Sequence, residues 1–209
     1  MQATLLPLFP LPVVVFPRTQ LPLHIFEERY KEMVGRAIHD HAEFGVVLVR
    51  EGAMVNMGCT VVVDRVLKEY PDGRFDIVTS GVRRFEILLI NEEKSYLRGE
   101  VNFFDDDEPG PPPVPLQQQA LQGYRELLQV DESPSFGEAA LDDPQLSFQL
   151  AQGLQDVDFL QRLLCLRSEA ARLKQVTEFL GEYVPKQRVT QRMKRLAPTN
   201  GHGPRPLER

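Results

Sequence analysis

Short apolar runs separated by polar or turn-forming residues fill the first hundred positions, a pattern that is typical of β-strands. The runs predicted as strands are FGVVLV, GCTVVVDRVLKEY, RFDIVTSGVRRFEILLI and YLRGEVNFF. Residues 70–74, YPDGR, predict a tight hairpin because Asp and Gly tolerate the positive φ that such turns need. Gly81, inside the following run, predicts a bulge or bend. This half of the chain therefore predicts a strongly bent sheet or a small barrel.

Prolines interrupt the apolar opening of the chain, at Pro7, Pro10, Pro12, Pro17 and Pro22. Proline has no backbone N–H and a fixed φ, so it does not occupy a central strand that is paired on both sides. We therefore predict a short buried strand over the proline-free residues 13–16, VVVF, and a second extended piece over residues 21–26, LPLHIF. The prolines are then expected at strand breaks, as corners of the barrel.

One helix is predicted between these pieces and the later strands. Residues 26–41, FEERYKEMVGRAIHDH, carry apolar side chains at helical spacing and acidic ones in the first turn. The predicted buried face consists of Phe26, Tyr30, Met33, Val34, Ala37 and Ile38.

Composition changes at residues 105–115, DDDEPGPPPVP, where charge and then proline replace the apolar pattern, and we predict a linker with few contacts. Beyond it the apolar period becomes 3.6 residues, which predicts a small helical bundle. The predicted helices are a stripe from Leu116 to Leu128, a helix capped by Asp142 or Asp143 with Pro144 in its first turn, the segment VDFLQRLLCLR, and SEAARLKQVTEFLGEYV capped by Ser168.

The predicted fold class is α+β, with a strongly bent sheet or small barrel followed by helices. We expect a barrel lobe with one helix over residues 1–104, an acidic and proline-rich linker over 105–115, and a helical lobe over 116–196. The tail over residues 197–209 is rich in Gly and Pro, and we expect it to be disordered.

The overall composition fits a soluble globular chain, with 42% hydrophobic and 26% charged residues among 209. No apolar run approaches the roughly 20 residues that span a bilayer, and no secretory signal pattern is found, so we expect a cytoplasmic protein with no membrane partner. The two cysteines, Cys59 and Cys165, fit a reducing compartment and are expected to be buried. The net charge of −6 argues against nucleic acid as a partner, although it is compatible with a local basic patch.

Motifs for catalysis, nucleotide binding and metal binding are not found in the sequence. There is no GxxxxGK[ST] loop and no CxxC or HExxH spacing. His39 and His41 stand two residues apart on a predicted helix and point in roughly opposite directions, which disfavours a shared metal ion. Close Ser and Lys neighbours, such as Lys94 and Ser95, arise by chance in most chains. We therefore expect no catalytic residue, no metal and no cofactor.

Several segments together resemble the N-terminal substrate-recognition domain of Lon proteases. These are LPLFPLPVVVFPRTQLPLHIFEERY, GVVLV, GCTVVVDRVLKEYPDGRFDIVTSGVRRFEI and LRGEV, in that order, with a weaker likeness over LSFQLAQGLQDVDFLQRLLCLRSEAARLKQVTEFL. The resemblance covers roughly residues 4–184 and implies a PUA-like, six-stranded pseudo-barrel followed by a helical bundle. Lon proteases continue into an ATPase module and a Ser-Lys peptidase, which this sequence lacks, so the resemblance implies a free-standing, non-catalytic domain.

Three functions are compatible with these features of the sequence. The leading one is a module that binds apolar segments of unfolded or damaged proteins, as an adaptor for a separate protease. The second is a PUA-like RNA-binding protein that uses Arg83, Arg84, Arg98 and the basic tail, although neighbours on a strand such as Arg83 and Arg84 face opposite ways. The third is a hydrolase, which needs a deep pocket with convergent titratable groups. The sequence does not indicate the oligomeric state.

Four phenylalanines are the candidate client-binding residues. Phe103 and Phe104 are neighbours in the last predicted strand, so one ring must face outward if that strand is regular. Phe9 and Phe16, in the proline-broken opening, are further candidates near the barrel rim. The competing interpretation is that these rings pack against the helical lobe and form the core between the two lobes.

Overall fold

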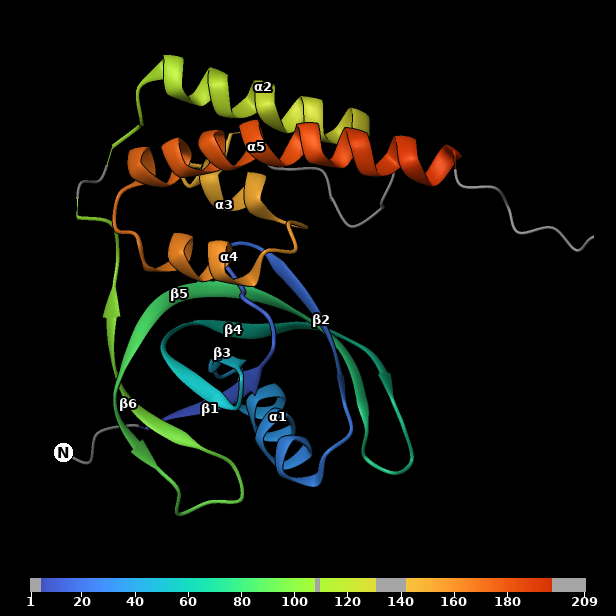
Figure 1. Ribbon diagram of the computed structural model, residues 1–209. Coiled ribbons are helices and arrows are strands. Elements are labelled where there is room, and N and C mark those ends of the chain that lie inside the picture. The colour runs from blue at the N-terminus through green and yellow to red at the C-terminus, as the bar shows by residue number, and fades with distance from the viewer. Residues whose placement is uncertain (1–4, 108–109, 131–141, 197–209) are drawn as a thin grey trace, which may run out of the picture.

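The computed structural model describes residues 5–107, 110–130 and 142–196. Its sheet has the strand order β2-β5-β4-β3-β1-β6, and a further pairing of β5 with β6 closes it into a barrel (Figure 1). The strands are β1 (Leu6–Leu11), β2 (Gln20–Ile25), β3 (Phe44–Arg50), β4 (Ala53–Glu69), β5 (Phe75–Asn91) and β6 (Arg98–Phe104). The helices are α1 (Glu28–Asp40), α2 (Val114–Val130), α3 (Leu146–Ala151), α4 (Val157–Cys165) and α5 (Glu169–Leu196). The predicted α+β class, a six-stranded barrel followed by helices, is confirmed.

The first strand lies earlier than predicted, because residues 13–16 are not a strand and β1 instead contains Pro7 and Pro10. The Leu8 amide donates to the Leu97 carbonyl, on the side of β1 that faces β6. Backbone nitrogens two residues apart in a strand face the same side, so the nitrogen of Pro10 also faces the β6 side. There β6 pairs only with Leu6 and Pro7 of β1, and among the described residues Pro10 has no partner on this side. The nitrogen of Pro7 faces β3, whose pairing begins only at Leu8. Neither proline therefore occupies a position where a registered partner needs its N–H.

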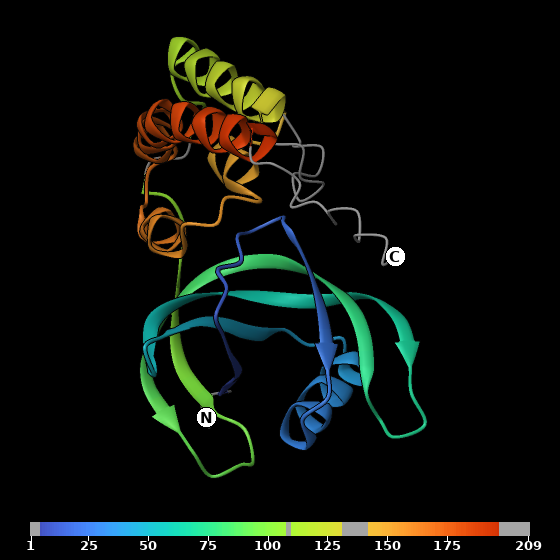
Figure 2. The same cartoon turned by 45° about the vertical axis from the view of Figure 1, so that its right-hand side comes forward.

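Helix α1 lies beneath the barrel, on the side away from the helical bundle (Figures 1 and 2). Tyr30, Met33, Val34 and Ala37 are buried as predicted. The prediction that Phe26 belongs to the buried face is wrong. The helix begins at Glu28 with Glu27 as its N-cap, so Phe26 lies before the first turn, and it is 60% exposed.

Strands β4 and β5 form the long hairpin of the barrel, and its turn is the predicted one, with Gly73 at φ 79°. The predicted irregularity at Gly81 is confirmed, since Cys59 pairs with Arg84 while Val61 pairs with Gly81. A Cβ on Gly81 would lie 2.0 Å from the Phe16 carbonyl oxygen, so the opening segment crosses β5 at a place that only glycine permits.

Helices α2 and α5 lie side by side, with α3 and α4 between them and the barrel (Figures 1 and 2). The predicted cap at Ser168 is confirmed, because its Oγ accepts from the Ala171 amide at 3.3 Å. Asp142 and Asp143 do not cap α3, which begins at Leu146; Asp143 instead accepts from the Gln145 amide at 2.7 Å.

The last helix is longer than its apolar stripe predicted. α5 continues through Pro185 to Leu196 rather than ending at Val184. A proline removes one helical hydrogen bond and usually kinks the helix, but its fixed φ is itself helical, so the chain resumes its turns beyond it.

The predicted linker over residues 105–115 has contacts at both ends. The Asp106 carboxylate bonds to Arg84 and Arg172, and the Asp107 amide donates to the Arg167 carbonyl at 2.9 Å. Val114, at the other end, already belongs to α2. The division into 1–104, 105–115 and 116–196 stays a prediction, and the tail over 197–209 lies outside the described residues.

Candidate functional site

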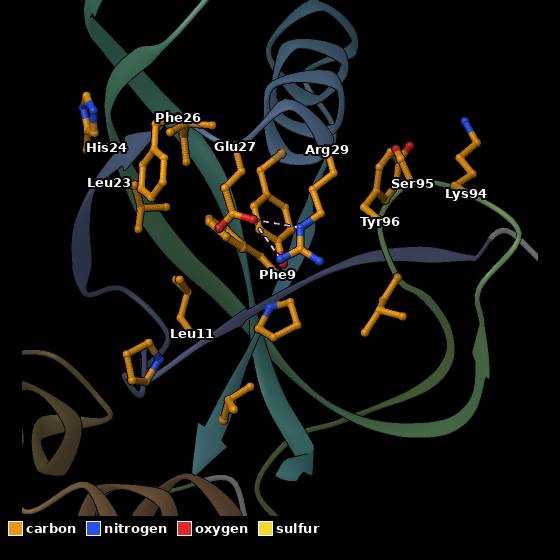
Figure 3. A pocket seen from close by; sticks show the side chains of 16 residues that line it. Phe9, Leu11, Leu23, His24, Phe26, Glu27, Arg29, Lys94, Ser95 and Tyr96 are labelled. Atoms are coloured by element: carbon orange, nitrogen blue, oxygen red, sulfur yellow. Dashed lines mark hydrogen bonds and ion pairs between the residues drawn. The ribbon is translucent and has the colours of Figure 1, made fainter. Parts of the chain in front are cut away.

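A cavity of about 590 Å³ lies between the proline-rich opening, the start of α1 and the loop that precedes β6 (Figure 3). We call it the first pocket. Among its lining side chains are Leu11, Leu23, Phe26, Arg29, Lys94 and Tyr96. Its lining comes from four parts of the sequence, residues 9–12, 23–30, 49 and 94–97, which meet at one side of the barrel.

The apolar part of the first pocket centres on Phe26. Its ring is 60% exposed, and it stacks only loosely on His24, with ring centroids 5.9 Å apart. Pro10 and Pro12 line the pocket on the opening segment. A large exposed aromatic ring beside further apolar side chains offers a surface on which another apolar group can be buried.

The polar part of the pocket is occupied by internal pairs. Arg29 forms an ion pair of 2.8 Å with Glu27, and its guanidinium lies 4.6 Å from the centre of the Tyr30 ring. At the rim His24 is hydrogen-bonded to Asp76, and this bond, together with one from the Tyr70 hydroxyl, holds the pKa of Asp76 below its ordinary value. The charges are thus largely balanced within the pocket.

The Ser and Lys neighbours in the pocket do not form a nucleophile and base. The Ser95 hydroxyl donates to Glu32 at 2.8 Å, and the Lys94 ammonium lies 3.9 Å from the other oxygen of the same carboxylate. A catalytic hydroxyl needs a base positioned to take its proton. Lys94 is therefore not placed as the base of a Ser-Lys pair.

Of the four predicted site residues, three are buried. Phe9 is 5% exposed and packs on Tyr30 with ring centroids 4.3 Å apart, so it forms the floor of the first pocket. Phe16 stacks on Phe148 of α3 at 4.7 Å, between barrel and bundle. Phe16 thus fits the competing interpretation of a core between the two lobes, whereas Phe9 is buried within the barrel lobe, against Tyr30 and Phe44.

The strand-end pair divides as alternation predicts. Phe104 is 9% exposed and lies 4.8 Å from the Arg84 guanidinium, whereas Phe103 is 39% exposed and lies 3.7 Å from that of Arg83. Phe103 is therefore the accessible ring among the four. The sequence reasoning missed Phe26, which a helix start at Glu28 would have separated from the buried stripe.

The three arginines proposed for RNA binding do not all lie on one surface. Arg84 is buried and donates to the carbonyl oxygens of Leu164 and Leu166, while Arg83 faces outward and pairs with Glu43 at 2.9 Å. Arg98 donates to Asn91 and is only 20% exposed. Phosphate binding depends on accessible cations in a row, which these positions do not supply.

The cysteines and histidines do not indicate chemistry. Burial raises the pKa of the Cys59 thiol to about 12, which keeps it protonated and inert. Cys165 is half-buried rather than buried as expected. Within the described residues no group of three or more His, Cys, Asp or Glu side chains gathers to hold a metal ion, and His39 bonds to Asp40. The helices in the same part of the chain include none that is long and apolar enough to cross a membrane.

Solved structures of two Lon N-terminal domains share this architecture. The Lon N-terminal domain protein from Xanthomonas campestris has a TM-score of 0.68 and 25% identity, covering 84% of this chain and 98% of that one. The N-terminal domain of the Mycobacterium avium complex Lon protease has a TM-score of 0.62, with 86% of this chain and 100% of that one covered. At 14% identity the second likeness concerns the fold alone.

The chain belongs to the family of the ATP-dependent protease La (Lon) substrate-binding domain, whose model matches residues 5–182. The Lon protease of Parabacteroides distasonis is 29% identical over 113 residues, which cover 50% of this chain and 14% of that protein. Lon protease 1 of Hydrogenovibrio crunogenus is 27% identical over 103 residues, covering 46% of this chain and 13% of that protein. The match is thus to the substrate-binding part of these proteases, and the chain spans only a small share of their length.

Proposed function

We propose that this chain is a non-catalytic recognition module that binds extended apolar segments of unfolded or damaged proteins in the first pocket. The observation that carries the proposal is the 60% exposed Phe26 ring beside the apolar side chains of the opening segment. Membership of a substrate-binding family supports the same conclusion.

The prolines favour recognition through side chains. A peptide that added a strand to the barrel beside β1 would need backbone N–H groups, and Pro10 offers none on the side that β6 leaves unpaired. An apolar client side chain is instead buried against Phe26, Leu11 and Leu23. Binding of this kind depends on a few aromatic and aliphatic anchors.

We further propose that the module delivers its clients to a separate protease and has no ATPase or peptidase activity itself. The Ser95 hydroxyl donates to the Glu32 carboxylate, the nearest acid to Lys94 is the same carboxylate, and the sequence has no phosphate-binding loop. The purified protein is expected neither to hydrolyse ATP nor to cleave casein. Turnover that follows the protein peak through stringent purification would contradict this expectation.

The binding proposal is tested with Phe26→Ser and a fluorescent, permanently unfolded client. We expect a loss of about ten-fold in affinity, because truncating an anchor ring costs more than 1 kcal/mol of binding free energy, with little change in melting temperature. Leu67→Ser is the matched control, since Leu67 is 61% exposed on β4 and does not line the pocket. An unchanged affinity in Phe26→Ser, or an equal loss in the control, would reject the pocket as the client site.

A further inference from the structure

A second cavity, of about 570 Å³, is also lined by the loop that precedes β6; we call it the second pocket. The start of β1, the second half of α1 and β6 contribute its walls. Lys94 and Tyr96 line both pockets. One extended ligand can therefore contact both pockets by passing this loop.

Cations outnumber carboxylates around the second pocket, although the chain as a whole has a net charge of −6. Its lining side chains include the cations Arg36, Arg83, Lys94 and Arg98 and the carboxylates Asp40 and Glu43. Both carboxylates are already engaged, because Glu43 accepts from Arg83 at 2.9 Å and Asp40 is bonded to His39 at 2.7 Å. The local excess of positive charge favours an anionic ligand.

Arg36 is the cation best placed to bind an anionic ligand. Among the described residues its exposed side chain forms no hydrogen bond or ion pair. Lys94 has its nearest carboxylate oxygen, from Glu32, only at 3.9 Å. Arg98 is bound through Nη2 to Asn91 and Glu93, and its buried Nε has no partner. The pocket thus presents cationic donors whose hydrogen-bonding capacity is not used.

Apart from His41 and Tyr96 the remaining lining is apolar, and it includes Leu6, Met33, Val101 and the exposed ring of Phe103. A ligand that fits carries an apolar group directly beside a single negative charge. The last residue of a polypeptide has this composition, since its α-carboxylate stands next to its side chain. A nucleic acid fits poorly, because its continuous row of phosphates would meet Asp40 and Glu43 as well as the cations.

We propose that the second pocket binds the C-terminal residue of client chains that end in an apolar amino acid, with Arg36 contacting the carboxylate. This inference rests on the proposed function, because it names the part of the client that the module recognises. The preceding residues of the client pass Tyr96 into the first pocket, which binds apolar side chains without regard to a chain end.

The test compares two ten-residue peptides of the same apolar sequence, both ending in Leu and labelled at the N-terminus, one with a free carboxylate and one with a C-terminal amide. Fluorescence anisotropy should give about ten-fold tighter binding for the free acid, because a hydrogen bond to a charged group is lost in the amide. Arg36→Gln should reduce the affinity for the acid to that for the amide, with the melting temperature unchanged. Arg74→Gln, at an exposed arginine of the β4–β5 hairpin, is the control and should leave both affinities unchanged.

Other outcomes separate the two proposals. Equal binding of acid and amide, or no effect of Arg36→Gln, overturns the terminal-residue proposal while leaving the first pocket untouched. Competition by acetate or phosphate that is as strong as competition by the unlabelled peptide also overturns it, because the pocket would then bind any small anion. Phe26→Ser should weaken both peptides by the same factor. Failure of both peptides to bind the wild-type protein overturns the terminal-residue proposal and the proposed function together.

Discussion

Asp106 and Arg172 are joined by two parallel hydrogen bonds of 2.6 Å each, from Nη1 to Oδ1 and from Nη2 to Oδ2. The same Oδ1 accepts from Arg84 Nη2 at 2.6 Å. Arg84 belongs to β5 and Arg172 to α5, and their side chains are 1% and 0% exposed. One carboxylate just after β6 therefore links the barrel to the helical bundle through two buried guanidinium groups.

Replacing this carboxylate should destabilise the protein strongly. In Asp106→Asn the two buried arginines lose a shared counter-charge, although Arg172 keeps an ion pair of 2.8 Å with Glu169. Breaking a buried ion pair typically costs 3–5 kcal/mol, and we expect about 3 kcal/mol here. Urea unfolding followed by circular dichroism measures it.

Asp107→Asn provides the control for this measurement. Its partner Arg167 lies at 2.9 Å, but both side chains are more than half exposed, so the loss should stay below about 1 kcal/mol. Equal effects of the two substitutions would contradict the role assigned to Asp106.

The junction should also make stability fall in acid. Burial acts to raise the pKa of Asp106, but the hydrogen bonds and charges of Arg172 and Arg84 outweigh it, so the pKa lies below its ordinary value. The stabilisation from Asp106 is therefore complete above about pH 4, the ordinary aspartate value, and is lost as the pH falls through its depressed pKa. Glu169 acts in the opposite sense, because burial raises its pKa and its protonation offsets part of the fall.

Unfolding free energies measured between pH 6 and pH 3 test this sign. The wild-type protein should lose stability in the acidic part of the range, and Asp106→Asn should show a shallower fall because it lacks the titrating group. A curve of the same slope in both proteins would mean that other carboxylates cause the acid sensitivity.

Local patterns in the sequence predicted much of the barrel. The apolar runs that became β3 to β6, the hairpin before Phe75 and the irregularity at Gly81 are properties of neighbouring residues. So is the opposite facing of Arg83 and Arg84. The family resemblance then supplied the closure of the barrel, which periodicity alone does not contain.

Other features depend on partners that a local pattern does not reveal. β1 tolerates Pro7 and Pro10 only because of where β3 and β6 begin and end their pairing. Asp106 stands in an acidic run that is typical of solvated loops, and only the fold brings Arg84 and Arg172 to it. The two pockets likewise join segments that are far apart in the sequence, so the local pattern did not indicate that Phe26 and Arg36 line cavities.

Gly81→Ala should destabilise the protein because the opening segment crosses β5 at that residue. The added Cβ would lie 2.0 Å from the Phe16 carbonyl oxygen, which is backbone and cannot rotate away. Overpacking typically costs 1–3 kcal/mol, and we expect about 2 kcal/mol or more, measured by urea unfolding.

Gly35→Ala is the matched control for that substitution. Gly35 lies inside α1, and a Cβ there meets no atom within 4 Å, so the helix should gain about 0.5–1 kcal/mol. If Gly81→Ala were as stable as Gly35→Ala, the close crossing of the opening segment over β5 would not exist in solution.

Phe103 and Phe104 should respond differently to replacement by Ser. Phe104 is 9% exposed against Arg84, so its truncation should cost about 3–5 kcal/mol of unfolding free energy. Phe103 is 39% exposed, and its main contact is the guanidinium of Arg83, an exposed cation–π interaction worth about 0.5–1 kcal/mol. Thermal and urea unfolding of the two variants should therefore separate them clearly.

Peptide affinity should also distinguish the two variants, because Phe103 lines the second pocket. In Phe103→Ser the free-carboxylate peptide should lose affinity while the fold stays intact, since an apolar wall of the pocket is removed without disturbing the core. Val82→Ser is the control, as Val82 is 38% exposed on the neighbouring β5 and does not line the pocket. If Phe103→Ser instead unfolds as readily as Phe104→Ser, the ring is part of the core, and it has to be removed from the proposed binding surface.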